Sequence, residues 1–378
     1  MRRFLLLLMI VLLPLTALAQ SMDDYTVDRF RARDVVGGAV IIARDGEILY
    51  GYDYGWKRAS RRDAVTLDTC FHAASVTKMV SAIGLLQLLD EHDISLDSPV
   101  RELVDLPIEN PHFPGQAITI RQVLSHTSSF AEVQYLKPLW DKIKPGSSYF
   151  SAVNAPGTAY EYSNMNGGLI GAMIEALSGQ SVNTYMRENV FEPLGINAAY
   201  HAALLPDQSD ISAKLRKNGE NFRSAEKEIA AFKDYEDTCD PRAHTDITSG
   251  SLYISANGLI RIVMMLSGGG ELDGVRILPE ETVQLMMQEQ HLIEGSSVRA
   301  ESRYGLCLAR IDGMTGGTWY GRQGRWQGLS CNAYFQPDTG LCVAVFANGY
   351  SAKTEDNVVT LARAFLEKAQ EFLPQSQP

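Results

Sequence analysis

A serine and a lysine three residues apart stand at the start of a strongly apolar stretch. Ser75 and Lys78 occur in the sequence F-H-A-A-S-V-T-K, and apolar residues then recur at three- and four-residue steps. This periodicity predicts a helix from Ser75 to about His92, which is apolar nearly all round and therefore expected to be buried. Side chains three apart share one helical face, so the hydroxyl and the amine meet at the helix N-terminus. Free backbone N–H groups there favour negative charge, as a serine nucleophile requires.

These residues alone leave a second interpretation of Ser75 open. The pattern S-x-x-K recurs from Ser224 to Lys227, in a charged segment with no apolar helix behind it, as expected of a chance match. Ser75 is therefore also compatible with an ordinary helix N-cap.

The first nineteen residues have the pattern of a secretory signal peptide. Arg2 and Arg3 precede an apolar run over residues 4–13, and Ala17-Leu18-Ala19 precedes Gln20. Because the run is short for a membrane span, we expect cleavage after Ala19, a secreted or periplasmic location, and no membrane span in the mature chain. An uncleaved N-terminal anchor is the alternative.

The net charge limits which kinds of molecule the protein is expected to bind. The 378 residues carry a formal net charge of -11, which argues against nucleic acid or an anionic membrane surface as the partner. The length suits one large domain or two closely packed ones. The tail at 373–378 is predicted to be disordered. The sequence does not indicate an oligomeric state.

One cysteine pair is excluded by strand register. Cys331 and Cys342 flank a predicted hairpin turn at 337–340, which sets Cys342 opposite Phe335 and Cys331 opposite Phe346. The two sulfurs then lie roughly 13 Å apart along the sheet, too far for a disulfide, so buried free thiols are expected. The sequence leaves the pairing of three further cysteines open, namely Cys70, Cys239 and Cys307.

Strand patterns lie at the two ends of the chain and helical patterns between them. Residues 38–52 form a predicted hairpin around an Asp-Gly turn. Further strands are predicted at 306–310, 328–335 and 341–347, a closing helix at 354–372, and central helices at 166–177 and 182–190. We therefore predict an α/β (α+β) fold in which an antiparallel sheet is flanked by helices. Residues 20–75 and 246–372 form a discontinuous domain, 76–245 an inserted helical domain, and the cleft between them a ligand site.

A second polar motif, Tyr162-Ser163-Asn164, lies 87 residues after Ser75 and is the only Y-x-N in the chain. With it, the chain resembles the serine β-lactamase-like hydrolases, which include class C β-lactamases, penicillin-binding carboxypeptidases, D-amino-acid peptidases and related esterases. The resemblance covers nearly the whole mature chain, including L-S-H-T-S at 124–128 and N-V-F-E-P-L-G-I at 189–196. It implies a β-lactamase/transpeptidase-like fold.

The resemblance also implies roles for the motif residues. Ser75 would be the acylated nucleophile, Lys78 and Tyr162 the general base and acid, and Asn164 a ligand of Lys78 and of the substrate's acyl amide. The chemistry is consistent, because a phenol with a pKa near 10 acts as a phenolate near neutrality only beside a cation. The alternatives are a core aromatic at Tyr162 and a turn or cap residue at Asn164.

The third motif departs from the family pattern of K-T-G, K-S-G or H-x-G. The aligned residues are Arg322-Gln323-Gly324, so an arginine replaces lysine or histidine. Arg322 keeps its proton, but it can lower the pKa of Tyr162 and hold a substrate carboxylate. Gly324 would keep the strand open to substrate, and the backbone N–H groups of Arg325 and Ser75 would form the oxyanion hole. A surface cation on an edge strand is the alternative for Arg322.

These features predict a serine hydrolase that acts on an ester, amide or lactam in a small molecule or short peptide. Esterase or peptidase activity is expected rather than efficient β-lactamase activity, because the third motif is atypical. The alternative is a catalytically weakened relative that binds peptidoglycan or protein. No cofactor or metal is expected, since metal-binding motifs are absent, and no G-x-S-x-G surrounds Ser75 to suggest a triad with His126. Residues 204–245 contain no motif that predicts a role.

Overall fold

The computed structural model describes residues 20–60, 62–131, 149–242, 247–290, 303–314, 316–355 and 358–374. The predicted signal peptide, most of the predicted disordered tail and the predicted domain boundary at 245/246 lie outside the described residues. The division into domains therefore stays a prediction. Within the described residues, no helix is long and apolar enough to cross a membrane.

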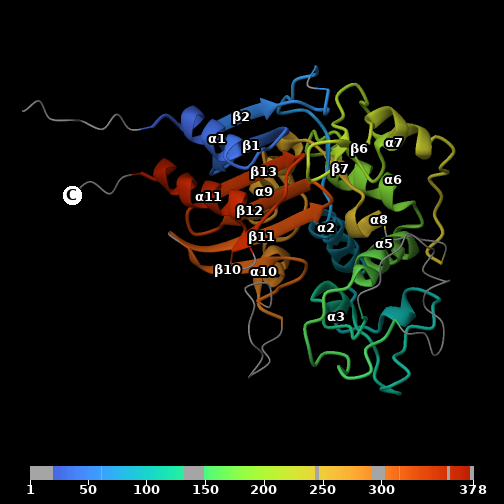
Figure 1. The fold of residues 1–378 in the computed structure, drawn as a ribbon. Coiled ribbons are helices and arrows are strands. Elements are labelled where there is room, and N and C mark those ends of the chain that lie inside the picture. The colour runs from blue at the N-terminus through green and yellow to red at the C-terminus, as the bar shows by residue number, and fades with distance from the viewer. Residues whose placement is uncertain are drawn as a thin grey trace, which may run out of the picture.

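A six-stranded antiparallel sheet joins the two ends of the chain (Figure 1). Its strand order is β10-β11-β12-β13-β1-β2, so the N-terminal hairpin pairs with the last long strand, Gly37 opposite Asn348. The hairpin turns at Asp45 and Gly46, which both have positive φ as a tight hairpin requires. The strands are β1 (Gly37–Arg44), β2 (Glu47–Gly55), β10 (Ala309–Met314), β11 (Gly317–Trp326), β12 (Leu329–Gln336) and β13 (Leu341–Asn348).

Helices cover both faces of this sheet. α1 (Met22–Arg31) and α11 (Thr360–Ala369) pack on one face, and α9 (Ala256–Ser267) packs on the other (Figure 1). Every residue of β12 and β13 is buried as a result. β13 is accordingly apolar from Leu341 to Ala347, whereas β12 also buries the polar side chains of Ser330, Asn332 and Gln336.

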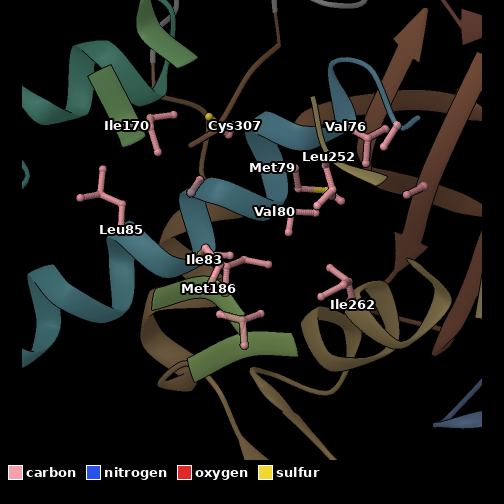
Figure 2. Packing of buried hydrophobic residues seen from close by; sticks show 14 of the residues in the cluster. Val76, Met79, Val80, Ile83, Leu85, Ile170, Met186, Leu252, Ile262 and Cys307 are labelled. Atoms are coloured by element: carbon pink, nitrogen blue, oxygen red, sulfur yellow. The ribbon is translucent and has the colours of Figure 1, made fainter. Parts of the chain in front are cut away.

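The helical part of the molecule is built around α2 (Val76–Glu91), which packs against α5 (Asn164–Ser178) and α8 (Ile247–Gly250). Figure 2 shows apolar side chains of α2, among them Met79 and Ile83, within this core. The predicted buried helix is thus confirmed. Further helices are α3 (Ile120–Leu124), α6 (Val182–Met186), which continues as a π-helix over Arg187–Phe191, α7 (Ala225–Ala231) and α10 (Glu280–Met287).

Short strands complete the fold. β3, β7 and β4 form a small sheet beside the start of α2, and β5 pairs with β6 in a hairpin. Their bounds are β3 (Phe71–His72), β4 (Ala198–Ala199), β5 (Lys214–Leu215), β6 (Asn221–Arg223), β7 (Tyr253–Ile254), β8 (Glu271–Leu272), β9 (Val275–Arg276), β14 (Thr354–Glu355) and β15 (Val358–Val359).

Two predicted boundaries were wrong. The strand expected at 306–310 begins only at Ala309, because Cys307 adopts a left-handed conformation with φ +56 that interrupts an extended run. The helix expected from 354 begins at Thr360, since residues before it form the short strands β14 and β15.

The cysteine register is confirmed. Cys331 lies opposite Phe346 and Cys342 opposite Phe335, and both thiols are buried and free. The three cysteines left open by the sequence are free as well, with only Cys239 exposed.

Candidate active site

Ser75 lies immediately before α2 and faces Tyr162. The Ser75 Oγ is 2.8 Å from the Tyr162 hydroxyl, and its side chain makes no cap hydrogen bond to the helix. The N-cap interpretation of Ser75 is therefore wrong. It holds instead for Ser224, whose side chain accepts the backbone N–H of Lys227 at the start of α7.

Lys78 is fully buried one turn along the same helix. Its Nζ donates to the Asn164 Oδ1 at 2.7 Å and to the Ser249 carbonyl at 2.6 Å, and lies 5.0 Å from the centre of the Tyr162 ring. Burial lowers the pKa of Lys78, opposed by its attraction to Tyr162 and reinforced by Arg322. Two carbonyl acceptors and a phenol nearby suit an ammonium group that donates in three directions.

Tyr162 is held in an environment that favours the phenolate. Burial by itself would raise the pKa of its hydroxyl, but the cations Lys78 and Arg322 outweigh burial, and hydrogen bonds from Lys78 and Ser75 add to them. The net result is a pKa below the ordinary value of 10. A lowered pKa in a phenol beside a serine hydroxyl is what a general base for that serine needs.

Arg322 is not a surface cation. Only 4% of its surface is exposed, and its Nε donates to the Ser75 carbonyl at 2.6 Å while a terminal nitrogen reaches the Cys307 carbonyl at 3.4 Å. The guanidinium also lies 5.7 Å from the centre of the Tyr162 ring and 5.3 Å from that of Tyr304. The side chain thus fixes the backbone of Ser75 and places a permanent charge beside Tyr162.

Gly324 lets β11 approach the start of α2. A Cβ added there would lie 2.3 Å from the Ala73 carbonyl oxygen and 2.8 Å from the Ser75 backbone nitrogen, closer than any side chain allows. β10 pairs with β11 only as far as Gly321, so the strand beyond it has an unpaired edge on that side. Arg325 follows with an exposed side chain, and its backbone N–H remains a predicted member of the oxyanion hole.

His126 supports Tyr162 rather than Ser75. Its buried ring lies 4.6 Å from the Tyr162 ring, and its Nδ1 accepts the Ser163 backbone N–H at 3.3 Å, with Asn166 Nδ2 at 3.0 Å. Since Nδ1 accepts a backbone N–H, the proton of the neutral imidazole is on Nε2. Burial, with Arg322 and Lys78 next, lowers the pKa of His126 well below its usual range.

The residues predicted from the motifs converge on one cavity of about 580 Å³. Ser75, Tyr162, Asn164, Arg322 and Arg325 line it, while Lys78 and Gly324 lie just beneath its wall. Several other lining residues were not predicted from the sequence, and Trp326, two positions after Gly324 on the same strand face, could have been inferred from the period of two. The missed residues include Tyr160, Lys217, Tyr304 and Trp326.

No cluster of three metal-ligating side chains occurs among the residues that the structure describes.

Replacing Arg322 by glutamine is expected to move the acidic limb of the pH profile of kcat/KM to higher pH. With the Tyr162 phenolate as the expected base, activity should fall as pH drops through the pKa of Tyr162, and loss of the cation should raise that pKa. The profile should be measured with a neutral ester against Arg101→Gln, a substitution of an exposed arginine paired with Glu109. An acidic limb that stays in place would show that Arg322 does not tune Tyr162.

The half-buried Ser75 and Tyr162 and the fully buried Lys78 meet at one cavity, as expected of the serine β-lactamase/transpeptidase-like proteins. The chain belongs to the beta-lactamase family, whose profile matches residues 18–367. Penicillin-binding protein 4 of Amycolatopsis lactamdurans is 26% identical over 330 residues, which are 83% of this chain and 81% of that protein. The matches to Penicillin-binding protein 4* of Bacillus subtilis and to Protein flp of Staphylococcus aureus each cover 46% of this chain, and they span only 40% and 36% of those two proteins.

Two solved structures confirm the predicted fold. The octameric penicillin-binding protein homologue from Pyrococcus abyssi has a TM-score of 0.71 at 21% identity, covering 93% of this chain and 76% of that one. The structure of SurE with D-Leu has a TM-score of 0.69 at 26% identity, with the same two coverages of 93% and 76%. The β-lactamase/transpeptidase-like fold is thus established for this chain.

Proposed function

We propose that the protein is a serine hydrolase that forms an acyl-enzyme on Ser75. The observation that carries the proposal is the 2.8 Å contact between the Ser75 Oγ and the Tyr162 hydroxyl, with buried Lys78 bonded to Asn164 and Ser249 beside it. A nucleophile, a base in hydrogen-bond reach and a third group that orients the base are the parts that nucleophilic catalysis requires.

In the acylation step, the Tyr162 phenolate takes the Ser75 proton as Oγ forms a bond to the substrate carbonyl carbon. The oxyanion that develops is stabilised by the backbone N–H groups of Ser75 and Arg325. Collapse breaks the bond to the alcohol or amine, which takes its proton from Tyr162. The nearby cations Lys78 and Arg322 stabilise each phenolate form.

In the second step, Tyr162 removes a proton from water as the water oxygen attacks the acyl carbon, and it returns that proton to the Ser75 Oγ when the bond between Oγ and the acyl carbon breaks, which releases the acid, free Ser75 and the Tyr162 phenolate. Each step leaves atoms and charge balanced, and needs no group besides those in the cavity. A cavity of about 580 Å³ suits a small molecule or a short peptide.

An ester or an amide, including a D-amino-acid peptide, is the proposed substrate rather than a β-lactam. The arginine at 322 supports this choice because it cannot relay a proton as the family's lysine or histidine can. The likeness to SurE with D-Leu supports the inclusion of D-amino acids. The signal-like pattern of residues 1–19 supports a secreted or periplasmic protein.

The test is a reactivity panel with nitrocefin, short-chain p-nitrophenyl esters and D-Ala-D-Ala peptides. We expect ester or peptide turnover well above nitrocefin turnover, and a single fluorophosphonate adduct on the tryptic peptide that contains Ser75. Binding of peptidoglycan fragments with neither turnover nor adduct would instead identify the weakened, binding-only relative.

A further inference from the structure

The hairpin of β5 and β6 contributes to the cavity lining, although it lies within the segment whose role the sequence did not reveal. Lys217 in the hairpin turn lines the cavity together with Arg325 and Trp326 at the end of β11 and Gln327 in the turn that follows. Tyr160 and Tyr304 line it as well.

The hairpin is fixed to the main sheet by backbone contacts. The Gly328 N–H donates to the Leu215 carbonyl at 3.2 Å, and a Cβ on Gly328 would lie 2.3 Å from the carbonyl carbon of Arg216. From β13, the Asn348 side chain donates to the Ala213 carbonyl at 2.6 Å. Lys217 therefore extends from an anchored turn, although its own side chain is exposed.

Trp326 is positioned by aromatic and charged neighbours. Its ring meets Phe222 of the hairpin edge to face, with centroids 5.0 Å apart. Lys214 lies 5.2 Å from the Trp326 ring and forms a 2.6 Å ion pair with Glu228, whose side chain is only 6% exposed. Glu228 thus balances the charge of Lys214. The contacts with Lys214 and Phe222 orient the Trp326 ring, whose apolar face lines the cavity.

The charges that line the cavity are all of one sign. Lys217, Arg322 and Arg325 line it, and among the residues that the structure describes no aspartate or glutamate does, although the chain as a whole carries a net charge of -11. Within the described part of the chain, neither Lys217 nor Arg325 has a carboxylate within 4.0 Å. A cationic cleft in an acidic protein concentrates anionic ligands and repels cationic ones.

We propose that the basic shelf, formed by Lys217, Arg325 and Trp326, binds an anionic group of the substrate at a distance from the scissile carbonyl. The two cations hold a carboxylate or a similar anion, and the Trp326 face takes the apolar part that links it to the ester or amide. This inference rests on the proposed serine hydrolase function and names its substrate class.

The test compares matched esters that differ in one charge. On the acyl side, the p-nitrophenyl monoester of adipic acid is compared with p-nitrophenyl hexanoate. On the leaving-group side, 3-acetoxybenzoate is compared with phenyl acetate. The ratio of kcat/KM for the anionic ester to that for the neutral one is measured in the unaltered protein, in Lys217→Gln, in Arg325→Gln and in the control Lys233→Gln, an exposed lysine outside the cavity.

We expect at least one pair to show a ratio of about 10, because charge-assisted hydrogen bonds to partly exposed cations give roughly that preference. The ratio should fall toward 1 in Lys217→Gln and in Arg325→Gln, decline with added salt, and stay unchanged in Lys233→Gln. The pair of esters that shows this ratio identifies whether the acyl group or the leaving group of the substrate carries the charge.

Neutral esters hydrolysed in a Ser75-dependent manner, with ratios near 1 in both arms, would overturn the shelf and leave the hydrolase intact. A ratio that persists in both shelf variants would also overturn it. Absence of Ser75-dependent turnover of all four esters would overturn the hydrolase proposal itself.

Discussion

Substitution of Ser75 by alanine is expected to abolish fluorophosphonate labelling and to lower kcat/KM for p-nitrophenyl esters by at least about 10³-fold. The hydroxyl is the proposed attacking group, and Tyr162, 2.8 Å away, has no other nucleophile to activate at that point. The fold should persist, since Ser75 makes no cap hydrogen bond and the removed atom borders the cavity. Both quantities should be measured on protein whose Tm has been compared with that of the unaltered chain.

Ser224→Ala is the matched control, since it alters the other S-x-x-K of the chain. This serine caps α7, so its loss should cost about 1 kcal/mol of stability and leave hydrolysis unchanged. Retention of ester turnover in Ser75→Ala, with loss in Ser224→Ala, would place the nucleophile elsewhere.

Tyr162→Phe is expected to reduce kcat/KM by roughly 10²- to 10⁴-fold, the range typical of a lost general base. The substitution removes the hydroxyl that contacts Ser75 but keeps the ring against His126, so the surrounding packing is retained. Labelling by fluorophosphonate should slow in parallel, because acylation also needs removal of the Ser75 proton. Steady-state kinetics and the rate of labelling provide the two measurements.

Tyr185→Phe serves as the control for removal of a buried tyrosine hydroxyl outside the cavity, and should leave both rates unchanged. If Tyr162→Phe also keeps both rates while Lys78→Met loses them, Lys78 acts as the base and Tyr162 only positions it. Loss of both rates in Tyr162→Phe and in Lys78→Met agrees with Tyr162 as the base and Lys78 as the cation that it requires.

The local sequence pattern was sufficient to predict the structure of segments that are determined by their own residues. The apolar period after Ser75 predicted α2, the Asp-Gly pair predicted the first hairpin, and the turn before Gly340 predicted which residues face Cys331 and Cys342. The motifs also pointed to residues that lie around one cavity, since Ser75 and Asn164 stand at the starts of helices and Arg322 lies on a strand whose side chains alternate between its faces.

Long-range contacts account for what the sequence could not predict. Arg322 donates to the backbone carbonyl of Ser75, and a carbonyl acceptor leaves no signature in residue type. Lys217 reaches the cavity because its hairpin packs on Gly328, a contact between segments more than a hundred positions apart. The left-handed Cys307 shifted a predicted strand for a similar reason, since its backbone N–H is held by the Leu124 carbonyl.

The pairing of β1 with β13 has a consequence for how the molecule is assembled. Gly37 lies opposite Asn348, so β1 can find its neighbour only after nearly the whole chain has been synthesised. Until then the N-terminal hairpin presents an unpaired apolar edge, which is prone to wrong association. Such non-local pairing also slows folding. Ser75 and β11, which lie on the two sides of the cavity, are therefore brought together late, and incomplete chains contain Ser75 without the strand that completes the cavity.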